Sequence, residues 1–86
     1  GGYIAVEIKT SANTEQVKKY RQELKRLRDL IKQNDTQFKH LVGGFASLVY
    51  STETQECILN EGLYALMPTG LDVELFVPEN FQAIEF

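Results

Sequence analysis

Residues 39–50 limit the possible folds more than any other stretch of the sequence, because they are apolar or small on both faces of an extended chain. A strand with this pattern is typically central in its sheet and buried between two layers. Gly43 and Gly44 within it allow a helix or a neighbouring backbone to approach closely, or form a bulge. His40, the only histidine, stands at the entrance of this strand, and we expect it to be structural or exposed.

A second stretch with strand character lies at residues 3–10. The β-branched residues at positions 4, 6 and 8 are two apart, so they share one face of a strand, and Glu7 and Lys9 share the other face. A carboxylate beside an ammonium group on a mostly buried strand is costly to bury unless the two are paired or hold a ligand. The pair is therefore a candidate for chemistry. The ordinary alternative is a solvated Glu–Lys pair on an edge strand.

Residues 15–33 change to a period of 3.6 and predict a long amphipathic helix. Its apolar stripe consists of Val17, Tyr20, Leu24, Leu27 and Ile31. A basic stripe follows one residue further on and consists of Lys18, Arg21, Lys25, Arg28 and Lys32. A charge stripe of this kind is usually a solvated helix face, and the functional alternative is a track of phosphate contacts.

The remaining segments are shorter. Residues 52–60 predict a short helix that ends before Gly62, since glycine commonly follows a helix. Residues 63–67 and 73–77 predict two strands, and the Pro-Thr-Gly sequence between them favours an antiparallel hairpin. The resulting order of strand, long helix, buried strand, short helix and two strands predicts an α/β fold. We expect a small mixed sheet with helices packed on its faces.

Length and composition set the outer bounds. The 86 residues are enough for a single small domain, residues 1–86, and no apolar run approaches the length of a membrane span. Cys57 is the only cysteine, which agrees with a reducing, cytoplasmic setting. All nine lysines and arginines precede position 41, although the net charge is −3. This polarity suits either contact with a phosphate backbone or complementary contact between copies of the chain.

Four segments together resemble a known family. The segment from Ala5 to Thr10 is similar to the E-x-K strand of the PD-(D/E)XK nuclease superfamily, and the element order after it also fits. Residues 44–50, 61–66 and 78–81 resemble a group of bacterial nuclease-like proteins within it. The resemblance implies a restriction-endonuclease-like fold and hydrolysis of DNA phosphodiesters with Mg²⁺ or Mn²⁺. These hard ions prefer oxygen ligands, and they activate bound water.

The same resemblance assigns roles to individual residues. It implies that Glu7 binds the metal ion and that the carbonyl group of Ile8 is a further ligand. Lys9 then positions the attacking water or stabilises charge on the scissile phosphate. Gln16 and Tyr20 match a Gln-x-x-x-Tyr pair of an exonuclease branch of the superfamily. Tyr20 also falls on the apolar stripe, so we expect it in the core and keep Gln16 as a weaker candidate.

One departure from the family pattern matters. Members carry an aspartate on a strand directly before E-x-K, and nothing in this sequence precedes Gly1. Gly1 and Gly2 suit a hairpin turn, although they are also a common cloning remnant. Either the acidic strand was lost, or this chain is the second half of the domain. We favour the second and expect a truncated domain that does not hydrolyse DNA alone.

A truncated sheet leaves the edge of its first strand unpaired, and an unpaired edge invites pairing with another chain. We therefore expect a homodimer or a larger homo-oligomer. The alternative to the nuclease hypothesis is a non-catalytic module on the same scaffold, which associates with itself or contacts DNA. The residues expected to contact DNA are Lys18, Arg21, Lys25 and Arg28.

Overall fold

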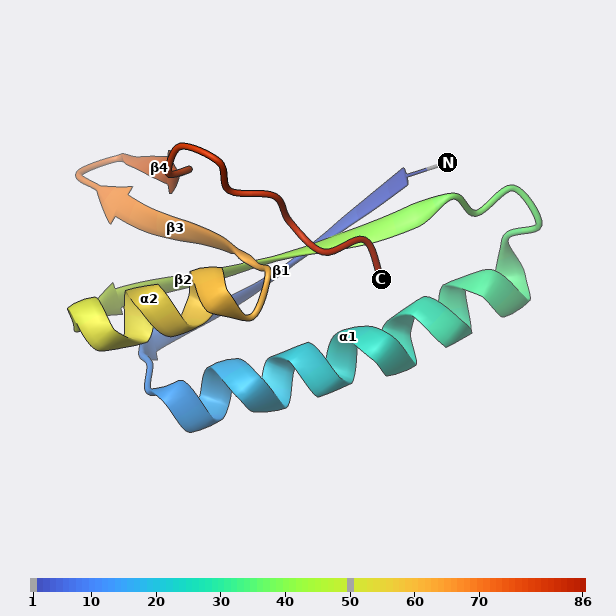
Figure 1. The fold of residues 1–86 in the computed structure, drawn as a ribbon, viewed down its shortest axis with the longest axis horizontal. Helices are drawn as coiled ribbons and strands as arrows, with labels where there is room; N and C mark the ends of the chain where they lie inside the picture. Colours follow the sequence, from blue (N-terminus) through green and yellow to red (C-terminus); the bar gives the residue numbers. More distant parts are fainter. Residues whose placement is uncertain (1, 50) are drawn as a thin grey trace.

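The computed structural model describes residues 2–49 and 51–86, and it is an α/β structure with a four-stranded mixed sheet and two helices (Figure 1). This confirms the expected α/β class with a small mixed sheet, whereas the restriction-endonuclease-like fold stays a prediction. Gly1 and Tyr50, which two of the expectations included, lie outside the described residues. The elements in chain order are β1 (Gly2–Ser11), α1 (Thr14–Asn34), β2 (His40–Val49), α2 (Thr52–Asn60), β3 (Tyr64–Thr69) and β4 (Asp72–Phe76).

The strands lie in the order β1-β2-β3-β4. β2 runs parallel to both β1 and β3, and β4 pairs antiparallel with β3, so the predicted hairpin is confirmed. The expected break at Pro68 is absent, because β3 continues through it to Thr69. The pairing of β3 with β2 reaches only to Leu66, so the missing N–H group of Pro68 interrupts no contact there.

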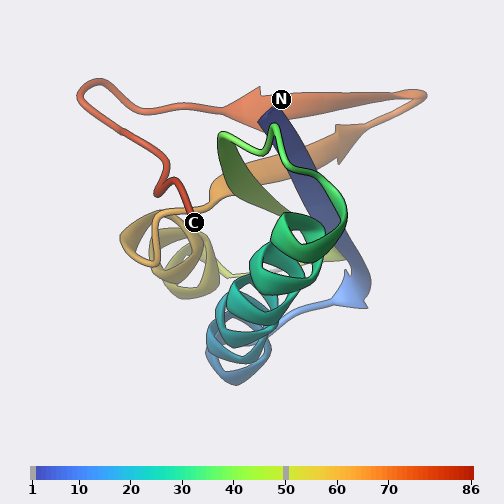
Figure 2. The same ribbon diagram turned by 90° about the vertical axis from the view of Figure 1, so that its right-hand side faces the viewer.

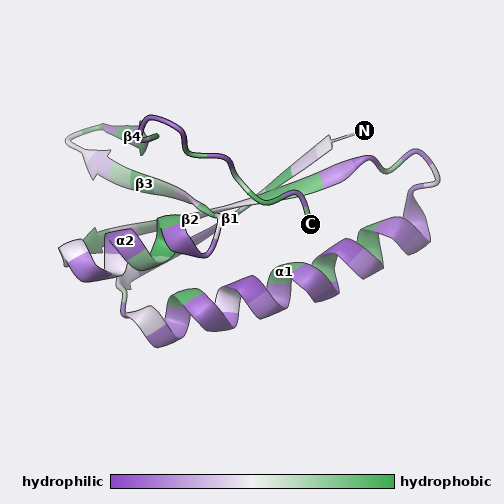
Figure 3. Ribbon diagram, in the orientation of Figure 1, coloured by the Kyte–Doolittle hydropathy of each residue, from purple (hydrophilic) through white to green (hydrophobic). Residues whose placement is uncertain are grey.

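Helix α1 begins where its sequence supplies a capping box. Asn13 accepts a hydrogen bond from the Gln16 backbone N–H (2.9 Å), and Gln16 Oε1 accepts one from the Asn13 N–H (3.1 Å). Val17, Tyr20 and Leu24 are its buried residues, as the stripe predicted. Elsewhere α1 is mainly hydrophilic (Figure 3). Neither described helix combines the length and the apolarity that crossing a membrane requires.

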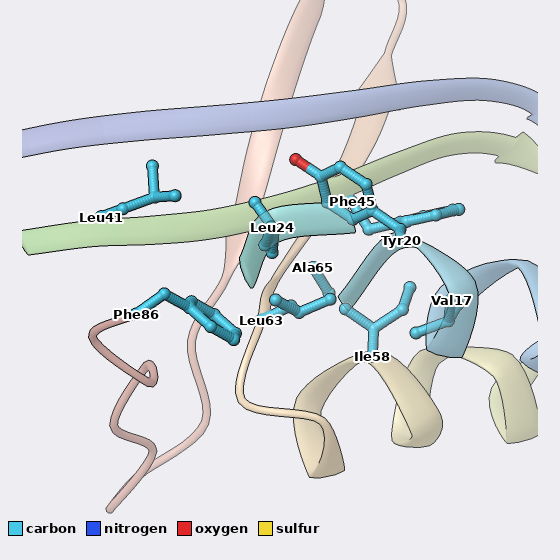
Figure 4. Packing of buried hydrophobic residues seen from close by; sticks show 9 residues of the cluster. All are labelled: Val17, Tyr20, Leu24, Leu41, Phe45, Ile58, Leu63, Ala65 and Phe86. Atoms are coloured by element: carbon cyan, nitrogen blue, oxygen red, sulfur yellow. The ribbon is translucent and has the colours of Figure 1, made fainter. Parts of the chain in front are cut away.

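The core fills the space between the helices and one face of the sheet (Figure 4). Leu24 lies directly over Gly43, where an added Cβ atom would collide with Leu24 Cδ1. The C-terminal tail closes one end of this space, because the Phe86 N–H donates to the Leu41 carbonyl (2.7 Å). The cluster consists of Val17, Tyr20, Leu24, Leu41, Phe45, Ile58, Leu63, Ala65 and Phe86.

Both helices cover the same face of the sheet (Figures 1 and 2). The expectation that helices pack on both faces is therefore wrong for the described residues, and so is the expectation of a mostly buried first strand. Ile4 and Ile8 are 74% and 75% exposed. Alternation along β1 holds as predicted, but the face turned toward α1 carries Glu7 and Lys9. Gly2 is already part of β1, and the ring of His40 lies against it.

The two central glycines provide a test of this one-sided packing. We expect Gly43→Ala to lower the free energy of unfolding by about 1–3 kcal/mol, because the methyl group would press on the buried side chains of Leu24 and Leu63. The matched control is Gly44→Ala, whose methyl group meets the tip of Leu66 on the opposite face. That tip can move, so the expected loss is under about 1 kcal/mol. Urea unfolding of both variants measures the difference, and equal losses would contradict the described faces.

Candidate functional site

Strand β1 brings Glu7 and Lys9 together on the face of the sheet that α1 partly covers. Glu7 lies beside Phe45 of β2 and Lys9 beside Ser47, so both project from the same side as the core. Lys9 Nζ is 3.3 Å from Glu7 Oε1, and their side chains are 42% and 32% exposed. The pair is thus neither surrounded by bulk solvent nor covered by the helix.

Helix α1 forms the opposite wall of a cleft of about 140 Å³. Its contribution follows helical spacing, because positions 16, 19, 20 and 23 fall on one flank of the helix. The hollow continues along the helix toward Leu27. A space of this size holds several water molecules or a phosphate group. The cleft is lined by Glu7, Lys9, Gln16, Lys19, Tyr20 and Glu23.

Tyr20 joins the core to the cleft. Tyr20 is 7% exposed, and its ring packs edge-on against the ring of Phe45, with 5.8 Å between the ring centroids. Its buried hydroxyl group lines the cleft and has no hydrogen-bond partner among the described residues. Burial, together with the nearby carboxylates of Glu7 and Glu23, raises the pKa of this phenol to about 12. Such an unsatisfied donor is uncommon in a folded protein and marks a place where a ligand can bind.

The cleft carries balanced charge. Glu7 and Glu23 are carboxylates, and Lys9 and Lys19 are ammonium groups. A cation and an anion can therefore both find an oppositely charged partner in it. As a metal site it is sparse, since the described residues contain no group of three His, Cys, Asp or Glu side chains placed to hold an ion. Magnesium tolerates few protein ligands because it keeps several waters, so two carboxylates are compatible with a weak site.

Two of the sequence-derived candidates in this region have other surroundings. The side chain of Ile8 lies on the opposite face of the sheet and is exposed. The Thr10 carbonyl and the Ala12 N–H point toward β2, so alternation directs the Ile8 carbonyl toward β2 as well. Gln16 reaches the cleft, but its Oε1 atom is occupied by the helix cap. The expected ligand role of Ile8 stays a prediction.

The basic stripe lies on the other flank of α1, away from the cleft. Arg21 Nη1 is 2.6 Å from Glu61 Oε2, and Arg28 Nε is 3.1 Å from Asp29 Oδ1. Lys18 borders a separate hollow whose other residues include Glu53, Glu56 and Glu61. Acidic groups therefore partly neutralise the stripe within the chain, and Lys18, Arg21, Lys25 and Arg28 do not extend the Glu7–Lys9 site.

Lys19 and Glu23 were not singled out from the sequence. The signal for them was available, because they lie three and seven residues after Gln16 and so share its helix flank.

Comparison with protein-family models, with curated proteins and with solved structures found no match for this chain.

Tyr20→Phe separates the core role of Tyr20 from its role in the cleft. Since the hydroxyl has no partner among the described residues, we expect the variant at pH 7 to lose less than about 1 kcal/mol of unfolding free energy, or to gain some. Folding raises the phenol pKa from 10.0 to about 12, so the folded state keeps its full stability with respect to this group below pH 10 and loses stability as the pH rises to 12. Urea unfolding across this range should show a fall of about 1–3 kcal/mol attributable to Tyr20. Tyr20→Phe should remove that part of the fall, and an unchanged slope would refute the assignment.

Proposed function

We propose that the cleft between β1 and α1 binds a divalent cation, Mg²⁺ or Mn²⁺, together with a phosphodiester group of DNA, as a nuclease-like site does. One observation carries the proposal. Lys9 Nζ lies 3.3 Å from Glu7 Oε1 in a cleft that also contains the Tyr20 hydroxyl, which has no hydrogen-bond partner within residues 2–49 and 51–86. This arrangement offers a ligand for a cation, a positive charge for a phosphate oxygen, and a neutral donor.

Each residue of the cleft would have a role that follows from its chemistry. Glu7 and Glu23 would hold the cation, and Lys9 and Lys19 would bind phosphate oxygens. Tyr20 would donate its proton in a hydrogen bond and would stay protonated, because its pKa is about 12. A divalent cation bound there would polarise the phosphate and lower the pKa of its bound water. Two carboxylates are few for such a site, so we expect the 86-residue chain to bind the ion and DNA without efficient hydrolysis.

Binding of Mn²⁺ tests the cation site. The proton relaxation of water in a Mn²⁺ titration should reveal a bound ion, and Glu7→Gln should weaken the binding at least about tenfold by removing a charged ligand while keeping its shape. Glu53→Gln is the matched control, because Glu53 is an exposed glutamate of α2 outside the cleft. The proposal fails if Mn²⁺ does not bind, or if Glu7→Gln binds it as tightly as Glu53→Gln.

A non-catalytic module on the same scaffold is the second candidate, and the edge of the sheet favours it. In the described part of the chain β1 pairs with β2 alone, so its outer edge offers backbone groups to an added strand. Self-association through this edge needs neither a cation nor DNA. The contact with DNA expected for the basic stripe is weakened by the pairing of Arg21 and Arg28 with acidic groups.

DNA binding distinguishes the cleft from the stripe. We expect Lys19→Ala to weaken binding of a short fluorescent duplex and to reduce the slope of log affinity against log salt by about 1, because one phosphate contact is lost. Lys25→Ala removes the same side chain from the stripe of the same helix and should change the affinity little. Fluorescence anisotropy over a range of salt concentrations measures both. The reverse result would place the DNA contact on the stripe.

A further inference from the structure

The face of the sheet away from the helices is exposed and apolar. Register across the four strands places the alternate residues of each on this side, beginning with Ile4 beside Val42 and ending with Pro68 beside Val73. None of these described strand positions is Asp, Glu, Lys or Arg. We call this surface the outer face and define it by its most exposed members. They are Ile4 (74%), Val6 (45%), Ile8 (75%), Leu48 (65%), Val73 (60%) and Leu75 (53%).

Single exposed leucines are ordinary, but a continuous apolar surface without charge is not. Three of the four strands are parallel to one another, and parallel sheets are almost always covered on both faces. The tail covers only one end of the outer face, where Phe81 packs edge-on against Tyr64 with 5.5 Å between centroids. The rest of the outer face therefore has the apolar, uncharged composition of a surface that is normally buried.

The solvent-accessible area of the chain indicates how much surface a partner would bury on the outer face. A folded monomer of 9.8 kDa is expected to expose about 5,200 Å². This chain exposes 5838 Å², an excess of roughly 700 Å². A stable interface buries about 800 Å² on each partner, so the excess matches one side of a dimer. The radius of gyration agrees, since 13.1 Å exceeds the roughly 12 Å expected for a compact chain of this length.

We propose that the occupant is a second copy of this chain, packed outer face to outer face. An isologous contact places the same patch on both sides, so it is suited to a surface without charge, where two copies do not repel each other. Two sheets pack face to face at about 10 Å through alternate side chains, which here are Ile4, Ile8 and Leu48. This contact is separate from the Glu7–Lys9 cleft, which opens on the helix side, and from the free edge of β1.

Sedimentation velocity of the 86-residue chain and three lysine variants tests the proposal. The wild type should be a dimer at about 100 µM. Leu48→Lys and Ile8→Lys should each weaken the dimer at least about 100-fold, because each buries a charge against an apolar face in both copies. The matched control is Leu30→Lys, an exposed leucine (57%) of α1 that lies outside the outer face. It should leave the dimer unchanged.

Each other result overturns the proposal. A monomeric wild type excludes a stable face-to-face dimer. A dimer that persists in Leu48→Lys, a change on central strand β2, points to pairing along the β1 edge instead. Dissociation by Leu30→Lys places the interface on the helices. If a lysine variant fails to fold, isotope-filtered NMR on mixed labelled and unlabelled wild-type chains decides. It should give contacts between copies among the methyl groups of Ile4, Ile8 and Leu48, and their absence in a dimer refutes the proposed face.

Discussion

The close packing of Leu24 on Gly43 sets the distance between α1 and the sheet. Without a Cβ atom at position 43, the helix lies near enough for Tyr20 to reach across Phe45 toward β1. Because α1 packs mainly over β2, the edge strand stays only partly covered. The cleft around Glu7 and Lys9 exists in this uncovered strip. Its position therefore follows from a packing contact in the core and not from any feature of the two charged residues themselves.

The elements themselves were largely predictable from the sequence. Hydrophobic period placed the long helix within one residue of Thr14–Asn34, and turn residues placed the antiparallel hairpin. Alternation correctly put Glu7 and Lys9 on one face. It could not say which face the helices cover, because that depends on the register between β1 and β2, whose paired residues are 38 positions apart. Here the register sets Glu7 beside the core residue Phe45 and turns the apolar face of β1 outward.

Part of the lining of the cleft could also be predicted from the sequence. Gln16 and Tyr20 were identified, and helical spacing would have added Lys19 and Glu23. The partner of Arg21 could not be read from the sequence, because Glu61 is 40 residues away and meets it only after α2 has packed beside α1. An isolated helix would leave Arg21 without this acidic partner. In the folded chain, Arg21 and Arg28 of the basic stripe pair with acidic groups.

The tail has a consequence for how the protein is made. Phe86 is 9% exposed and belongs to the same cluster as Leu41 and Leu63, so the core is complete only when this residue is in place. During synthesis the ribosome releases the chain from its N-terminus, and position 86 emerges last of the residues described. Until then Leu41 and Leu63 lack one of their apolar neighbours. A nascent chain of this sequence therefore leaves part of its interior open to chaperones until that residue is free to fold back.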